Sequence, residues 1–428
     1  MSDKIKFQSL TGMHDILPED QAYIKRLQKS VESISNYYSF GKIETPILEQ
    51  AEVFSKAVGA DTDVVGKEMY TFKTKGGDFV ALRPEGTAPV MRSYLEHGMH
   101  NLPQPVKLWY MGPFFRYERP QAGRFRQFHQ FGFEVIGEKN PSIDGQVIQM
   151  SYDVLKEVGF KNISIELNSI GYSECRPYFK KILTSYLKSK KSSLCTDCQR
   201  RLKDNPLRIL DCKEEKCQRV KAGAPQIIDH LCENCHSHFK QVLEFLDELE
   251  LPYTLNPYLV RGLDYYTKTV FEIVETTEDG KSLGTLIGGG RYDNLAKLLG
   301  GRDVPACGSA GGVERIVSLM KQREMKLGKQ DEPAKIFLAQ LGQLAKRKSL
   351  KLFEEFRDAK IPVAESFSKD SLKAQLRSAN KMGIRYVLIF GQKEALEDFI
   401  TLRDMDNGTQ KEIKLDKVVA EMKAKIKK

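Results

Sequence analysis

Residues 112–135, GPFFRYERPQAGRFRQFHQFGFEV, constrain the fold most, because they predict a β-hairpin with one charged face. Successive side chains of a strand point to opposite faces, so Arg116 and Glu118 share a face. On the return run this face carries Arg124, Arg126, Gln130 and Glu134, and the opposite face carries Phe125, Phe131, Phe133 and Val135. Pro120 and Gly123 suit the connection between the runs. Charged groups seldom line a buried face without a ligand, so we expect a small zwitterion or a phosphate here; the alternative is a solvated outer face.

An amphipathic helix is predicted before the hairpin. Apolar residues recur three and four positions apart at Ile24, Leu27, Val31 and Ile34, and Gly41 suits the end of the helix. Later runs have the texture of antiparallel strands: DFVALRP, VKLWYMGPFFRYE, RQFHQFGFEVIG and VFEIVE. The predicted fold class is therefore α+β, a large antiparallel sheet with helices.

The length of 428 residues favours two or three domains, and changes in composition predict where they divide. Residues 1–170 and 258–325 carry the strand patterns of one domain, interrupted at 171–257 by a lysine- and cysteine-rich helical insertion. Residues 326–335 are polar and charged, as linkers are. Residues 336–428 alternate strand and helix patterns, which predicts a small α/β domain.

Charge and hydropathy indicate the class of partner. The net charge of +10 favours a polyanionic partner, and residues 331–428 contribute to it with 21 Lys and Arg against 15 Asp and Glu, a net of +6. No segment reaches the roughly 18 apolar residues of a membrane span. The start, MSDKIKFQSL, lacks the apolar core of a signal peptide. We expect a cytoplasmic protein without a membrane partner.

Further segments complete the charge pattern of the hairpin: LRPEGTAP (82–89), LVRGLDYYTKTVFE (259–272), GTLIGGGRYDNL (284–295) and GSAGGVERI (308–316). Each alone has an ordinary structural explanation. A triple glycine is more often a tight turn or close packing than a phosphate site, and it matches no P-loop spacing. A tyrosine pair is more often part of a core, and an arginine on the first turn of a helix is usually exposed. The four segments and the hairpin together, in contrast, form a specific signature.

This combination resembles the signature of class II aminoacyl-tRNA synthetases, and along almost the whole chain that of the histidyl-tRNA synthetase family. TPILE, with Pro46, is similar to motif one, the dimer-interface element of the class. The charged hairpin is similar to motif two, and GSAGGVERI to motif three. LVRGLDYYT and GGGRYD resemble the two segments peculiar to the histidine enzymes.

The resemblance implies a class II catalytic domain with an inserted helical domain, a C-terminal anticodon-binding domain and a homodimer. The implied reaction activates L-histidine with ATP, as its Mg²⁺ complex, to histidyl-adenylate and pyrophosphate, and then transfers histidine to the 3' end of tRNA(His). One alternative is a non-catalytic regulatory subunit of histidine biosynthesis, which predicts erosion of the arginines and loss of the C-terminal domain. A synthetase for glycine, proline or threonine is the other, and RGLDYY and GGGRYD argue against it.

The resemblance also implies catalytic roles for arginines. Joining a carboxylate to the α-phosphate of ATP brings two anions together, and fixed guanidinium groups stabilise the charge that develops. Arg116 would hold the α-phosphate and Arg315 the γ-phosphate end. Glu118 and Arg124 would complete the ATP site. Arg261 would lie near the α-phosphate and the histidine carboxylate.

The histidine-binding residues implied by the resemblance are Glu85, Gly86, Thr87, Gln130, Glu134, Arg261, Tyr265, Tyr266 and Tyr292. Carboxylate and carbonyl oxygens suit the ammonium group, and a carboxylate with hydroxyls suits the imidazole. A site that hydrogen-bonds both ring nitrogens can reject apolar amino acids without editing, because its polar groups would be left unpaired. Arg119 and Gln121, in the hairpin loop, are the residues implied to contact the tRNA acceptor end.

The cysteines of the insertion suggest a metal. Cys195-x2-Cys198 and Cys232-x2-Cys235 are separated by 33 residues, which is the pairing of a structural tetrathiolate zinc site. Cys212 and Cys217 lie between the two pairs, and His236 and His238 are alternative ligands nearby. Reduced thiols without a metal are the alternative. We expect Cys175 and Cys307 to be lone thiols, because nothing near them in the sequence would lower their pKa.

Overall fold

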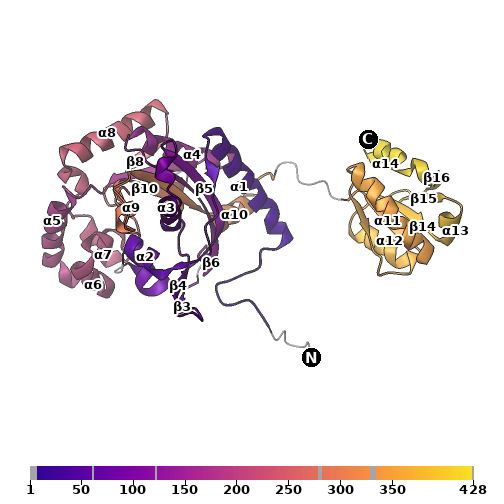
Figure 1. Cartoon of the computed structure of the whole chain (residues 1–428), viewed down its shortest axis with the longest axis horizontal. Helices are drawn as coiled ribbons and strands as arrows, with labels where there is room; N and C mark the ends of the chain where they lie inside the picture. The colour runs from indigo at the N-terminus through magenta and orange to yellow at the C-terminus, as the bar shows by residue number, and fades with distance from the viewer. Residues whose placement is uncertain (1–6, 60–61, 121–122, 278–281, 328–333, 427–428) are drawn as a thin grey trace. The chain divides into compact units, whose positions relative to one another are not determined.

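The computed structural model describes residues 7–59, 62–120, 123–277, 282–327 and 334–426. Within these residues the chain divides between positions 327 and 328 into an N-terminal and a C-terminal compact unit (Figure 1). Each unit has hydrophobic core clusters of its own. No described helix is long and apolar enough to cross a membrane.

A large sheet forms the centre of the N-terminal unit. Its strands run in the order β1 (Gly41–Lys42), β5 (Val106–Phe115), β6 (Gln127–Ile136), β11 (Ala306–Gly312), β10 (Ser282–Arg291), β9 (Thr267–Thr276), β7 (Ile163–Ser169) and β8 (Tyr253–Leu255). The central pairs are antiparallel, whereas β1 with β5 and β7 with β8 are parallel. The predicted α+β class is confirmed, with parallel pairs added at the two edges.

Helices cover one face of this sheet. They are α1 (Pro18–Tyr37), α4 (Ser142–Val158) and α10 (Val313–Gln322). Their apolar stripes share a core with Phe131, Phe133 and Val135 of β6. The predicted stripe of α1 is confirmed, but its predicted end is wrong: α1 ends at Tyr37, Ser39 takes a left-handed backbone with φ 61°, and Gly41 already belongs to β1.

The other face carries shorter elements: β2 (Leu48–Gln50), α2 (Ala51–Val58), the π-helix η1 (Val64–Glu68), β3 (Thr71–Lys73), β4 (Phe79–Leu82), α3 (Thr87–Glu96), η2 (Met99–Asn101) and α9 (Leu295–Leu298). Strands β2, β4 and β3 form a small antiparallel sheet. Helices α2 and α3 share a core cluster with Tyr110 and Phe114 of β5. The polar face of the hairpin therefore points into the space between the large sheet and α3, which we call the space below α3.

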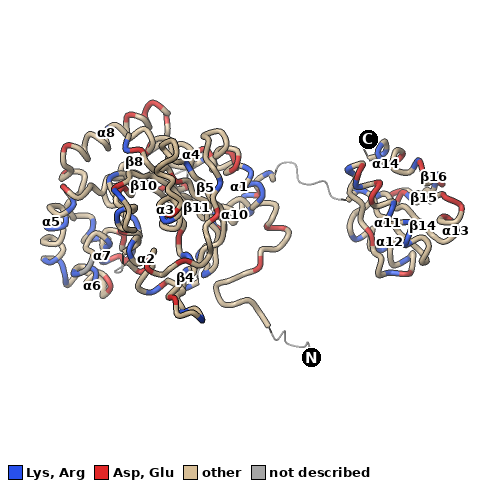
Figure 2. The backbone as a smooth tube through the Cα atoms, in the orientation of Figure 1, with Lys and Arg blue, Asp and Glu red and all other residues tan. Residues whose placement is uncertain are grey.

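A largely helical segment separates β7 from β8. It consists of α5 (Arg176–Ser189), η3 (Lys191–Ser193), α6 (Thr196–Asp204), η4 (Pro206–Asp211), α7 (Glu215–Lys221), η5 (Ile227–His230) and α8 (Glu233–Glu248). Figure 2 shows lysines and arginines along its outer helices, from α5 to α6. The four-part domain division itself stays a prediction.

The C-terminal unit is an α/β domain. Its sheet has the order β13 (Val363–Glu365), β12 (Ile336–Gln340), β14 (Tyr386–Phe390), β15 (Phe399–Asp404) and β16 (Gln410–Lys414). The other elements are α11 (Gln343–Asp358), α12 (Leu372–Lys381), α13 (Gln392–Leu396), η6 (Leu415–Lys417) and α14 (Val418–Ile426). The first three strands are parallel, as the alternation of strand and helix patterns predicts. Strands β15 and β16 instead form an antiparallel hairpin, which that alternation does not predict. Its signal was Asn407-Gly408, with Gly408 at φ 71°.

Candidate active site

The charged hairpin forms as predicted in its strand region. In the β5–β6 register Gln130 pairs with Gly112, and Glu134 with Leu108. Gln130 and Glu134 share the polar face, whereas Phe131 is fully buried on the helical side. Strand β5 ends at Phe115, so the predicted charged residues that follow it lie in the connection and not in the strand.

A cavity of about 630 Å³ opens beside the end of the hairpin. Among its lining residues are Arg116, Glu118, Arg124, Gln130, Arg261, Glu272 and Thr285. The inserted segment contributes to the same wall through Arg201, Arg208 and Cys212. Most residues predicted for ATP are thus brought to one cavity, together with Arg261.

The hairpin arginines do not all serve this cavity. The Nε of Arg116 donates to the carbonyl of Pro84 at 2.9 Å, which fixes its guanidinium, and Arg124 pairs with Glu118 at 3.3 Å. Arg126 instead lies over the ring of Tyr117, 3.9 Å from its centroid. The expectation that Arg126 belongs to the ligand face is therefore wrong, because β6 begins only after it and an aromatic ring takes its guanidinium.

Arg261 is held by a carboxylate that the sequence did not single out. Its guanidinium bonds to Glu272 of β9, which also accepts from the hydroxyl of Thr285. Gly288 makes room for it, since a Cβ at this position would lie 2.4 Å from the guanidinium. The triple glycine is thus close packing within β10 and not a turn. The available signal for Glu272 was a lone carboxylate inside the apolar run VFEIV.

Arg315 has a different environment from the other predicted arginines. It is not among the described residues that line the cavity. Its guanidinium donates to the carbonyl of Leu283 at 2.8 Å, two positions before Thr285. Gly284 allows this approach, because a Cβ there would lie 2.0 Å from the guanidinium.

A cluster of buried carboxylates and hydroxyls lies below α3. Glu134 is 1% exposed; it accepts from the hydroxyl of Thr87 at 2.8 Å and from that of Tyr292. Glu85 is 4% exposed; it accepts from the backbone N–H of Thr87 at 2.7 Å and from the hydroxyl of Tyr265 at 3.2 Å. Tyr266 joins the cluster, its ring 4.7 Å from that of Tyr265. Residues predicted for histidine are therefore assembled from segments far apart in the sequence.

Burial controls the protonation of this cluster. It raises the pKa of Glu134 to about 8, and the hydroxyl donors Tyr292 and Thr87 offset only part of the effect. It also raises the pKa of Glu85, against the opposing influence of the N–H groups at the start of α3. Without a ligand, Glu134 therefore holds a proton at neutral pH, and a donor or cation entering the cluster would favour its ionised form.

Tyr110 is a member of the cluster that sequence reasoning missed. Its ring is sandwiched by glycines, because a Cβ on Gly86 or on Gly132 would lie 2.4 Å from it. Its hydroxyl is buried and makes no hydrogen bond of standard geometry to a described residue, although it lies close enough to Glu134 and Thr87 to interact with both. Burial and the nearby charges of Glu134 and Glu85 raise the pKa of Tyr110 well above its ordinary value. A buried hydroxyl without a hydrogen bond of standard geometry is available to a ligand.

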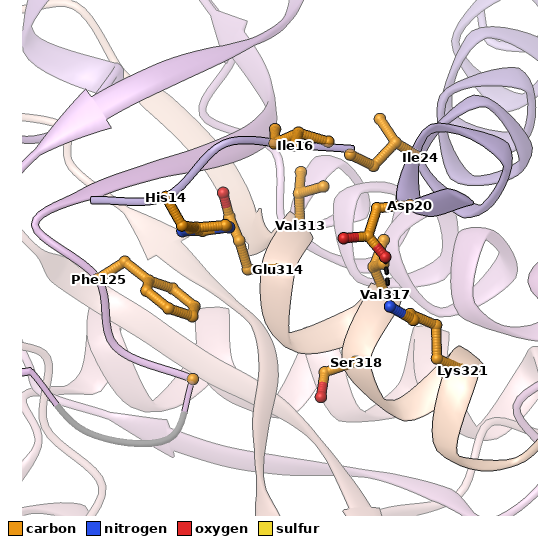
Figure 3. Close-up of a pocket in the computed structure, with 11 residues that line it drawn as sticks. His14, Ile16, Asp20, Ile24, Phe125, Val313, Glu314, Val317, Ser318 and Lys321 are labelled. Carbon is orange, nitrogen blue, oxygen red and sulfur yellow. Dashed lines mark hydrogen bonds and ion pairs between the residues drawn. The ribbon is translucent and has the colours of Figure 1, made fainter. Parts of the chain in front are cut away.

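A second pocket, of about 230 Å³, lies between the start of α1 and α10 (Figure 3). The ring of His14 faces Phe125 with centroids 4.4 Å apart, and Asp20 pairs with Lys321. Glu314 accepts from the backbone N–H of His129 at 2.8 Å. The described residues that line this pocket include none of the predicted ligand-binding residues.

The structure divides the cysteines differently from the sequence prediction. Cys195 and Cys198 cluster with Cys212 and Cys217, whereas Cys232 and Cys235 cluster with Cys175. The predicted ligand set Cys195, Cys198, Cys232 and Cys235 is wrong, because the two CxxC turns begin different helices, α6 and α8, and each finds nearer sulfurs.

The two remaining cysteines have opposite outcomes. Cys175 is not a lone thiol: although burial raises its pKa, hydrogen bonds from the backbone N–H groups of Cys232 and Tyr172 and from neighbouring thiols lower it overall. Burial raises the pKa of Cys307 well above its ordinary value, as expected for an unreactive core thiol. In the hairpin loop, Arg119 is exposed, and Gln121 lies outside the described residues.

Comparison with known proteins identifies the family. The family model for histidyl-tRNA synthetase matches residues 12–316, and that for an anticodon binding domain matches residues 335–425. Over 420 residues the chain is 45% identical to a histidine–tRNA ligase of Dehalococcoides mccartyi, covering 98% of this chain and 100% of the relative. A histidine–tRNA ligase of Syntrophotalea carbinolica is 45% identical over 412 residues, 96% of this chain and 97% of the relative.

A solved structure agrees with these relatives. The crystal structure of apo S. aureus histidyl-tRNA synthetase superimposes with a TM-score of 0.78 at 34% identity, covering 97% of this chain and 99% of the other. With both domains matched along the whole length, the chain belongs to the histidyl-tRNA synthetase family of ATP-dependent aminoacyl-tRNA ligases.

Proposed function

We propose that this chain is a histidine–tRNA ligase whose substrates meet where the arginine-lined cavity adjoins the buried cluster below α3. MgATP and L-histidine react to histidyl-adenylate and pyrophosphate, and histidine then passes to the 3' end of tRNA(His). One observation carries the assignment: Arg261 lines the cavity and lies 5.7 Å from the ring of Tyr266, so cations for phosphates and acceptors for an amino acid are adjacent.

In the first step the histidine carboxylate attacks the α-phosphorus, and pyrophosphate leaves. The carboxylate is already ionised at neutral pH, so no general base is needed. Arg116, fixed by the carbonyl of Pro84, binds the α-phosphate, and Arg261 holds the incoming carboxylate beside it. Both guanidinium groups stay charged and fixed while negative charge grows on the phosphate oxygens. Arg315 binds the γ-phosphate end.

Histidine is recognised by the buried cluster. Glu85, Thr87 and Gln130 accept hydrogen bonds from its ammonium group. Glu134, Tyr266 and Tyr292 bind the imidazole, with Tyr265 and the glycine gap at Gly86 shaping the pocket. Glu118 and Arg124 lie on the adenine side of ATP. Amino acids without ring nitrogens would leave Glu134 buried without its ligand partner, which disfavours them strongly.

The direct test is exchange of labelled pyrophosphate into ATP as a function of the amino acid supplied. We expect exchange with histidine and none with glycine, proline or threonine. Exchange with one of these, or none with histidine, would contradict the proposal. A regulatory subunit would show no exchange; the presence of the C-terminal domain and of the cavity arginines favours the enzyme.

Transfer to tRNA involves the hairpin loop and the C-terminal unit. The unit's family is that of an anticodon binding domain, and the net charge of +6 over residues 331–428 suits phosphate contacts. The loop residues Arg119 and Gln121 meet the acceptor end.

We expect Arg119→Ala to lower aminoacylation of tRNA(His) roughly tenfold, the effect of one lost charge-assisted hydrogen bond. Pyrophosphate exchange should stay unchanged, because Arg119 is exposed and outside the described lining of the cavity. Measuring both reactions on this variant and on Arg302→Ala, another exposed arginine, separates loop contact from general charge loss. Equal loss in both reactions would rule out a role confined to tRNA.

The active form is a cytoplasmic homodimer. The small sheet of β2, β4 and β3 and the turn before it expose large apolar side chains: Ile47 at 43%, Leu48 at 46%, Phe72 at 44% and Phe79 at 56%. A second copy of the chain is the occupant we assign to this surface, since the TPILE segment that resembles motif one contributes Ile47 and Leu48. Light scattering at twice the chain mass of 48.7 kDa would agree with it.

A further inference from the structure

Four sulfur atoms converge in the inserted segment, all within its described residues. The Sγ atoms of Cys195, Cys198, Cys212 and Cys217 lie within 4.8 Å of one another, and those of Cys195 and Cys212 are 3.9 Å apart. A zinc ion with four thiolates at about 2.3 Å in a tetrahedron separates its sulfurs by about 3.8 Å. All four are free thiols. Their spacing therefore matches a tetrathiolate site.

Hydrogen-bond donors and cations lie near these sulfur atoms. The backbone N–H of Cys195 points to Cys217 Sγ at 3.2 Å, and that of Cys198 to Cys195 Sγ at 3.4 Å. Cys195 caps the N-terminus of α6, where the helix dipole favours an anion. Arg201 and Lys221 lie close enough to interact electrostatically with Cys198 and Cys212, respectively.

We propose that Cys195, Cys198, Cys212 and Cys217 bind one Zn²⁺ as a structural tetrathiolate that holds the inserted segment against the active-site cavity. Each thiol loses its proton to solvent on binding, so four protons leave and the complex carries a charge of −2. The N–H donors and the neighbouring cations offset this charge. All four coordination positions are filled by protein, which leaves none for a substrate and makes the site structural.

The proposed site lies where a cross-link is needed. It joins the first turn of α6, the end of η4 and the middle of α7, which are short elements. Helix α6 carries Arg201, which pairs with Asp63 at 2.6 Å; η4 carries Arg208, which donates to the carbonyl of Arg261 at 3.3 Å. Zinc would therefore position the wall that supports Arg261, and two of its ligands, Cys195 and Cys212, are part of the cavity lining.

The other cysteine cluster provides a matched control. Cys175, Cys232 and Cys235 offer three sulfurs with no fourth His, Cys, Asp or Glu ligand among the described residues. Replacing Cys232 and Cys235 together removes two thiols from the same segment but leaves the tetrathiolate intact. Replacing Cys212 and Cys217 together removes half of the proposed ligands.

The test measures zinc per chain by elemental mass spectrometry on full-length protein equilibrated with ZnCl2 and desalted. We expect one tightly bound zinc per chain in Cys232→Ser/Cys235→Ser, and a loss of that zinc in Cys212→Ser/Cys217→Ser. No bound zinc in the Cys232→Ser/Cys235→Ser protein, with its four remaining cluster thiols reacting freely with a thiol reagent, would overturn the proposal. So would retention of zinc in Cys212→Ser/Cys217→Ser.

A second measurement does not depend on the folding of the ligand variants. Cobalt(II) replacing zinc in the unmodified full-length chain should give thiolate charge-transfer bands and the intense visible bands of a tetrahedral tetrathiolate. A spectrum without thiolate charge transfer would contradict the proposal. Both readouts are independent of pyrophosphate exchange, so the metal site and the proposed reaction can fail separately.

Discussion

Replacing Arg261 by alanine is expected to lower histidine-dependent pyrophosphate exchange roughly 10²- to 10³-fold in kcat, the effect of removing one fixed donor from a developing anion. The guanidinium lines the cavity and is held by Glu272 in a space that Gly288 leaves open. It is therefore in place before the substrates arrive. Initial-rate exchange at saturating ATP and histidine measures the loss.

The controls for this variant separate chemistry from folding. Arg219→Ala removes an exposed arginine of α7, paired on the surface with Glu215, and should leave exchange unchanged. Arg261→Lys keeps the charge but loses the two-pronged donor, so an intermediate rate is expected. Light scattering should show the same mass for all these proteins. A near-normal rate in Arg261→Ala, with that mass retained, would refute a catalytic role for this arginine.

Replacing Glu134 by glutamine should lower kcat/KM for histidine on the order of 10²-fold, because a hydrogen bond from imidazole to a buried charged acceptor is lost. The side chain keeps its shape, and the hydroxyls of Thr87 and Tyr292 can still bond to an amide. The binding of histidine should weaken much more than the binding of ATP. Steady-state exchange at varied histidine and varied ATP measures both, and an equal effect on the two would contradict the assignment to the imidazole.

The pH dependence follows from the raised pKa of Glu134, about 8 without ligand. An ionised carboxylate accepts a bond from an imidazole N–H more strongly than a protonated carboxyl group does, so KM for histidine should fall as the pH rises from about 6.5 towards 8. A folded-state pKa raised above the unfolded value of 4.5 means that this group contributes stability at low pH, which is lost as the pH rises through 8. Glu134→Gln should therefore melt at a higher temperature than the unmodified protein above pH 8, with a reduced difference below it. A difference in melting temperature that does not change with pH would contradict the raised pKa.

Local pattern predicted the elements that depend on neighbours in the sequence. The alternation of Gln130, Phe131 and Phe133 placed polar and apolar side chains on the correct faces of β6, and the spacing of Ile24 and Leu27 predicted α1. The resemblance to the histidyl-tRNA synthetase family then implied roles for individual residues, which composition alone does not indicate. The helix end at Gly41 failed because the chain turns earlier, at a non-glycine residue with positive φ.

Packing between segments far apart in the sequence determined which side chains contact each other. The carboxylate that holds Arg261, the glycine gap around Tyr110 and the sulfur partners of Cys195 come from segments separated by many residues. A CxxC spacing predicts that two sulfurs are close, but it cannot say which other sulfurs the fold brings to them. The same holds for Arg126, whose guanidinium found an aromatic ring in place of the cavity.

Contiguous residues were sufficient to predict the α+β class and the charged hairpin, because strand alternation and helical periodicity are properties of short segments. The family was recognised through the resemblance of its motifs. Three features became visible in the folded chain alone: Glu272 partners Arg261, Tyr110 packs into the buried cluster with Glu134 and Glu85, and the cysteines separate into two groups. These outcomes depend on the register of β9, β10 and β6 and on the packing of short helices. Such register and packing are set by contacts summed over the whole core, and no short segment encodes them.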